Sequence, residues 1–79
     1  MTTEYAQGVA QAAYDQLQVG SVGWLRPDSE KGETIEAFQA VAGVMDEMQR
    51  DGLIRIRSVH KESMSGRCLI DTIQFLKTL

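Results

Sequence analysis

The sequence has little of several features that mark specialised classes of protein. A single cysteine, Cys68, excludes an intramolecular disulfide and agrees with a reducing compartment. No apolar run approaches the roughly 18 to 20 residues that a membrane span needs. The first ten residues have neither a basic start nor a continuous apolar segment. We therefore expect no membrane partner and a cytoplasmic location.

What is present is the composition of an ordinary globular domain. The chain has 79 residues, of which 43% are hydrophobic and 24% are charged. We expect a single domain over residues 1–79. A chain of this size buries only about 60 to 65% of the surface that its unfolded form exposes. Its free energy of unfolding should therefore be modest, roughly 4 to 12 kcal/mol.

The charge is unevenly distributed along the chain. Residues 1–54 carry three basic residues against nine acids, whereas residues 55–79 carry five basic residues against two acids. The first part is therefore acidic and the last part is basic, although the net charge is only −3. Such asymmetry bears on the choice of binding partners rather than on the fold.

Two segments have the apolar spacing of amphipathic helices. The first runs from Thr2 or Thr3, either of which can cap it, to about Gln18, and its apolar stripe is mostly alanine. The second runs from Glu33 or Thr34 to Asp51. Its predicted buried residues are Ile35, Phe38, Val41, Ala42, Met45 and Met48. Gly43, in the interior of this helix, indicates a close contact or a mild bend.

Strands are expected between and after the helices. A short strand over residues 21–24 should place Trp24, followed by Leu25, in the core, and a turn or a single helical turn is expected over residues 27–31. After the second helix, Gly52 suits a C-cap. Two strands, over residues 53–59 and 68–76, then form a hairpin with its turn at residues 62–66.

This order of elements, with the letters DGLI at the helix exit, resembles the winged-helix superfamily. The resemblance implies a small α+β domain in which helices pack against a C-terminal β-hairpin, called the wing. It further implies binding of duplex DNA in a regulatory role, with the helix before the hairpin in the major groove and the wing on the backbone or minor groove. The sequence departs from the pattern because it shows no separate helix and tight turn before the second helix.

The predicted nucleic-acid contacts lie mainly in the wing. Basic side chains cluster within thirteen residues of the hairpin: Arg55, Arg57, His60, Lys61 and Arg67. On the preceding helix, Gln39 is a candidate base reader and Arg50 a candidate phosphate contact. Aromatic residues that could stack single-stranded bases are absent from the basic cluster. A simpler interpretation is that strand Lys and Arg keep an exposed hairpin soluble.

The acidic face of the second helix suggests an alternative function. The exposed face of the second helix carries Glu36, Asp46 and Glu47, so a winged-helix scaffold that has lost DNA reading could dock a basic protein partner there. The sequence leaves open whether the chain works as a homodimer, for which the alanine-rich helix is the candidate interface. A His60–Cys68 pair across the hairpin and nearby acids fall short of a catalytic or zinc site. We therefore predict no enzyme activity, no metal and no cofactor.

Overall fold

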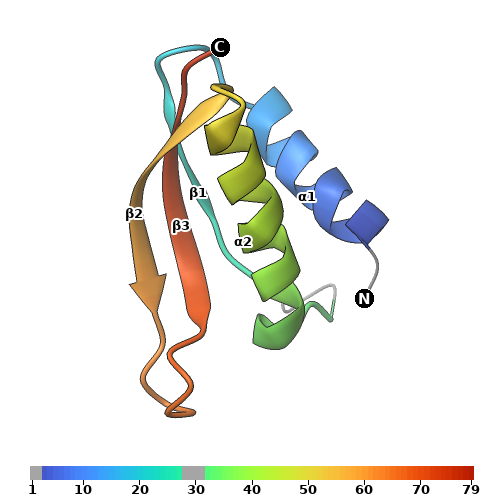
Figure 1. Cartoon of the computed structure of the whole chain (residues 1–79), viewed down its shortest axis with the longest axis vertical. Helices are drawn as coiled ribbons and strands as arrows, with labels where there is room; N and C mark the ends of the chain where they lie inside the picture. Colours follow the sequence, from blue (N-terminus) through green and yellow to red (C-terminus); the bar gives the residue numbers. More distant parts are fainter. Residues whose placement is uncertain (1–2, 28–31) are drawn as a thin grey trace.

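Two helices cover one face of a three-stranded antiparallel sheet in a computed structural model of the chain (Figure 1). The structure describes residues 3–27 and 32–79. The elements, in chain order, are α1 Thr3–Asp15, β1 Val22–Leu25, α2 Ile35–Arg50, β2 Ile54–Lys61 and β3 Ile70–Lys77. The predicted α+β class is thus confirmed. Thr2, the side chain of Thr3 and residues 28–31 of the predicted turn lie outside the description.

The sheet has the order β1-β3-β2, so the last strand lies in the middle. β2 and β3 form the long hairpin, and β1 pairs with the other edge of β3. The β2–β3 register shifts twice, and Arg57 and Asp71 are the residues left without a partner at these shifts. Each shift changes which side chains face the helices, because neighbouring residues in a strand point to opposite faces.

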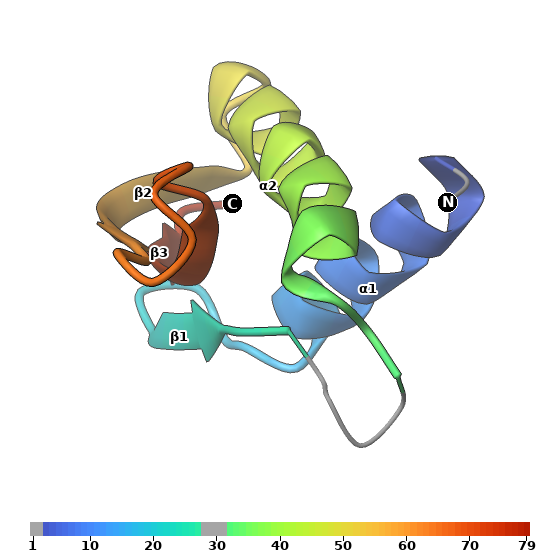
Figure 2. The same ribbon diagram turned by 90° about the horizontal axis from the view of Figure 1, so that it is seen from below.

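The core lies between the helices and the sheet, as Figure 2 shows from below. Its buried apolar residues are Ala6, Ala10, Phe38, Val41, Met45, Met48, Ile54, Ile73 and Phe75. Ala6 and Ala10 belong to the alanine stripe of α1, and their small size lets α1 approach α2 closely. These two alanines are therefore buried inside the domain and are not available for a dimer interface.

Local signals explain where α2 begins and ends. The Thr34 hydroxyl accepts a hydrogen bond from the Ala37 amide at 3.1 Å, so Thr34 is the N-cap. Gly52 has φ 81°, the left-handed conformation that glycine adopts without steric cost. The predicted second helix is confirmed to within a residue or two at each end.

One prediction about packing was wrong, and one of the two explanations offered for Gly43 is excluded. Trp24 is 58% exposed, because it pairs with Gln74 on the sheet face that points away from the helices. Its neighbour Leu25 alternates to the other face and packs against the core, as expected. Gly43 makes no close contact, since a Cβ added there would meet nothing within 4 Å. Among the residues described, no helix combines the length and apolar character needed to cross a membrane.

Candidate nucleic-acid interface

The candidate interface is built on the β2–β3 hairpin, which extends past the N-terminal end of α2 (Figure 1). We call the exposed cations of this arm, Arg55, Arg57, His60, Lys61 and Arg67, the basic hairpin. β2 is an edge strand, so the four residues that it contributes stand at the margin of the sheet. All five predicted residues lie on this hairpin: Arg55 and Arg57 where β3 also pairs with β1, and His60, Lys61 and Arg67 beyond the end of β1, toward the tip.

Arg55 and Arg57 lie close together on β2, with only Ile56 between them in the sequence. Arg55 pairs with Leu76 across the hairpin, whereas Arg57 is the extra residue at the first register shift. Both arginines line the same hollow of about 320 Å³, together with Ile56 and Leu76. Strand alternation places residues two apart on the same face, so both guanidinium groups reach this hollow even though Arg57 has no partner on β3.

His60 lies farther along β2 and has a partner. It pairs with Thr72, and its Nδ1 lies 2.6 Å from Asp71 Oδ1. Asp71 is the residue without a β2 partner at the second register shift, which leaves its carboxylate beside the imidazole. Cys68, exposed in the loop before β3, does not pair with His60 across the strands. The pairing of His60 and Cys68 considered from the sequence is therefore not formed.

The hairpin tip has an internal scaffold around Glu62, which is only 9% exposed. Its carboxylate accepts hydrogen bonds from the backbone amide of Ser65, at 3.2 Å, and from the Ser65 hydroxyl. The Ser65 hydroxyl in turn accepts from the Arg67 amide at 3.2 Å. This network of hydrogen bonds holds the shape of the tip. The Glu62 carboxylate binds the Ser65 donors and forms no ion pair with Lys61 or Arg67.

Four cations of the basic hairpin carry no ion pair. Over residues 3–27 and 32–79, only Arg50 and His60 have a carboxylate within 4.0 Å. Arg55, Arg57, Lys61 and Arg67 are therefore free to approach an anionic ligand. A guanidinium without a carboxylate partner retains its full capacity for a phosphate, which it can bind through two hydrogen bonds.

The two predicted contact residues on α2, Arg50 and Gln39, both have partners within the chain. Arg50 bridges to Asp46 on its own helix at 3.3 Å, so its charge is largely balanced. Gln39 was expected on the exposed face of α2, and that placement was wrong. Its amide nitrogen donates to the carbonyls of Ile35 and Ile70, at 2.8 and 2.7 Å, and its oxygen accepts from the Ile70 amide at 3.0 Å. The Gln39 side chain thus hydrogen-bonds the backbone of β3 at Ile70, beyond the last residue of β3 that pairs with β1.

Sequence reasoning missed one aromatic residue beside the arginines. Trp24 and Ser58, next to Arg57, pair with the same residue, Gln74, from opposite sides. Arg26 lies 6.0 Å from the centroid of the Trp24 ring. Alternation predicts that either Trp24 or the pair Gly23 and Leu25 is exposed, but it does not say which.

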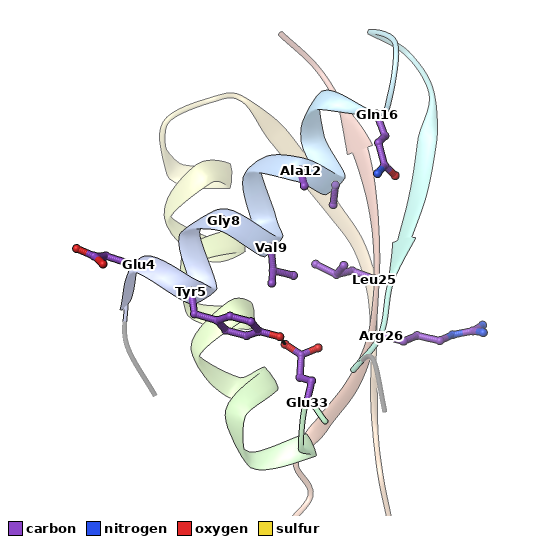
Figure 3. A pocket seen from close by; sticks show the side chains of 10 residues that line it. Glu4, Tyr5, Gly8, Val9, Ala12, Gln16, Leu25, Arg26 and Glu33 are labelled. Atoms are coloured by element: carbon purple, nitrogen blue, oxygen red, sulfur yellow. Dashed lines mark hydrogen bonds between the residues drawn. The ribbon is translucent and has the colours of Figure 1, made fainter. Parts of the chain in front are cut away.

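A cleft of about 530 Å³ lies between α1 and β1 (Figure 3). Tyr5 donates a hydrogen bond to Glu33 at 2.9 Å across one end, and Val9 and Leu25 form its apolar wall. Figure 3 shows the side chain of Arg26 directed away from it. The cleft is mostly apolar, and Glu33, 8% exposed, already accepts from Tyr5.

Comparisons with protein-family models, curated proteins and solved structures found no match to this chain. Within the described ranges, no three His, Cys, Asp or Glu side chains gather as a metal ion would require. The chemistry of the interface therefore has to be argued from its own residues, and its main property is positive charge on a projecting hairpin.

Proposed function

We propose that the chain is a winged-helix-like domain that binds duplex DNA through the basic hairpin, in a regulatory role in the cytoplasm. Three features support the winged-helix assignment: the element order, the sheet order β1-β3-β2, and the long C-terminal hairpin. The N-terminal end of α2 and the hairpin tip lie at the same end of the molecule (Figure 1). Arg55 and Arg57 lie at the base of the hairpin, so a duplex that meets all the cations has to run along β2 to the tip, where it would also meet α2.

One observation carries the proposal: Arg55, Arg57, Lys61 and Arg67 are exposed and have no carboxylate within 4.0 Å in the described part of the chain. Neutralising about four phosphates predicts a slope near −3.6 in log K against log salt. Between about 50 and 200 mM salt, the affinity for duplex DNA should therefore fall about 150-fold.

Direct reading of bases contributes little in this account. The exposed side of α2 carries Glu36, Asp46 and Glu47, which repel phosphates, and Gln39 is engaged with β3. Binding should accordingly depend weakly on sequence. A homodimer would add a second wing to the same duplex.

The test is a titration of fluorescently labelled random-sequence duplex at low and moderate salt, read by anisotropy. Replacing Arg55 and Arg57 together by glutamate should abolish binding and leave the circular dichroism spectrum unchanged. For a control matched in charge, Arg50→Glu is compared with the single change Arg55→Glu, because Arg50 is already paired on α2. Unchanged binding by the double variant, or an equal loss in Arg50→Glu, would contradict binding through the wing.

The second candidate is a protein-interaction module that docks a basic partner on the acidic helix face. A specific observation favours it: a cleft of about 450 Å³ between α1 and α2 is bordered by Glu47 and Asp51 and contains Met48 and Val44. Its apolar floor and acidic rim suit a segment with alternating apolar and basic residues. Binding of such a peptide, lost in Glu47→Lys but kept in the Arg55 and Arg57 double variant, would favour this function.

A further inference from the structure

Among the described residues, no element covers the face of the sheet opposite the helices, because α1 and α2 both lie on the other side (Figure 2). Residues that pair across antiparallel strands project from the same face. One row across this face is Val22, Leu76 and Arg55, and the next is Trp24, Gln74 and Ser58. We call these six residues the open sheet face.

Trp24 dominates the apolar part of this face. It is 58% exposed, and Val22 beside it is also exposed. The backbone of Trp24 is fixed by its pairing with β3, which keeps the ring on this face of the sheet. A flat ring held in this way offers a surface on which a base can stack, and every base has a face that suits it.

The charge of the open sheet face is positive. Arg55 and Arg57 stand at the β2 edge, and Arg26 lies 6.0 Å from the Trp24 ring centroid at the other edge. Asp71 is the only acid in the three strands, and His60 engages its carboxylate. A second copy of the same face would bring arginines against arginines, so charge complementarity favours an anionic occupant.

We propose that the open sheet face binds single-stranded nucleic acid, with one base stacked on Trp24 and the backbone crossing toward Arg55 and Arg57. Neighbouring strands lie about 4.8 Å apart, so β1 and β2 are about 10 Å apart across β3. One or two nucleotides can span that width. The inference shares Arg55 and Arg57 with the proposed duplex binding, but it adds Trp24, which a duplex on the hairpin tip does not need. It also reverses the expectation that no aromatic residue accompanies the basic cluster.

Trp24 is the only tryptophan in the chain, so its fluorescence reports directly on this contact. The experiment is a titration of the wild-type protein with an oligothymidylate of about twelve nucleotides at low salt. Stacking predicts strong quenching that saturates with binding. An unchanged emission at saturating oligonucleotide, with binding established independently by anisotropy, would overturn the inference. Absence of any binding would overturn it too.

Variants separate stacking from general charge attraction. Anisotropy of the labelled oligonucleotide should show Trp24→Ala weakened about 5- to 100-fold, whereas Trp24→Phe keeps most of the affinity. The matched control is Met64→Ala, which removes another large exposed side chain, 95% exposed, from the hairpin tip. If Trp24→Ala and Met64→Ala lose the same amount of affinity, the oligonucleotide binds at the hairpin tip, which would contradict the inference. If Trp24→Ala fails to fold, the quenching of Trp24 in the wild-type protein still decides.

The two proposals fail separately. Duplex binding that depends on Arg55 and Arg57, with no oligothymidylate binding, would support the proposed function and overturn the open-sheet inference. Oligothymidylate binding that depends on Trp24, without duplex binding, would do the reverse. Trp24 emission that changes with protein concentration in the absence of nucleic acid would indicate self-association through this face and would also overturn the inference.

Discussion

Replacing Gln39 by alanine should destabilise the fold without touching any surface that binds a partner. The Gln39 amide makes two hydrogen bonds with the backbone of Ile70, one as donor at 2.7 Å and one as acceptor at 3.0 Å. Its third bond returns to the Ile35 carbonyl on its own helix. The alanine variant would leave both backbone groups of Ile70 without these partners, at the point where β3 extends past the end of β1.

The expected magnitude follows from the two bonds to Ile70. A net contribution of about 0.5 to 1.5 kcal/mol each gives a loss of roughly 2 kcal/mol. Because the site is only half-buried, water can replace part of each bond, which argues against a larger figure. For a domain of this size, 2 kcal/mol corresponds to a fall in Tm of about 8 to 16 °C.

Urea unfolding followed by circular dichroism measures this loss, and amide hydrogen exchange at Ile70 localises it. Gln39→Glu is the informative companion, since its carboxylate can accept from the Ile70 amide but repels the two carbonyls. It should destabilise at least as much as Gln39→Ala. The control is Gln7→Ala on the exposed side of α1, which should be close to neutral. A Gln39→Ala variant within about 0.5 kcal/mol of wild type would refute the reasoning.

Three further changes test other contacts. Lys77→Ala should lower stability by about 1 to 2 kcal/mol, measured by urea unfolding, because the ammonium donates to two carbonyls at the C-terminal end of α1. Gly23→Ala should cost about 1 kcal/mol by the same measurement, since its Cβ would lie 2.7 Å from Leu17 Cδ1, a flexible side-chain end. Glu62→Ala should speed amide exchange at the hairpin tip and cost about 1 to 2 kcal/mol, because the Ser65 amide and hydroxyl lose their acceptor.

Each of these predictions has a control substitution or a result that would contradict it. Lys61→Ala, without an ion pair among the described residues, should be neutral, and an equal effect in Lys77→Ala and Lys61→Ala would contradict the helix-end contact. Gly43→Ala, with open space around it, should stabilise α2 by about 1 kcal/mol, in contrast to Gly23→Ala. Tip exchange unaffected by Glu62→Ala would show that the network around Ser65 does not hold the tip.

The elements with a strong repeating pattern could be predicted from the sequence. The buried face of α2 follows from apolar spacing over sixteen residues, and Gly52 marks its end. The exposure of Arg55 and Arg57 follows from simple alternation in β2. In each case the signal is local and repeated several times, so no tertiary information is needed.

The rest depended on contacts between distant parts of the chain. β1 has only four residues, so its pattern could not tell whether Trp24 or Leu25 faces the helices, and the pairing of Trp24 with Gln74 decides this. The role of Gln39 depends on where β1 ends relative to Ile70. The register shift at Arg57 has no glycine or proline to mark it, so the sequence could not predict it.

The central claim is that the basic hairpin binds nucleic acid through its unpaired cations. Backbone amide shifts of the isotope-labelled protein, recorded by NMR during titration with random-sequence duplex at about 50 and 200 mM salt, test it most directly. The account predicts shifts centred on residues 55–67 that weaken strongly at the higher salt. No shifts at low salt, or shifts confined to the cleft between α1 and α2, would contradict it.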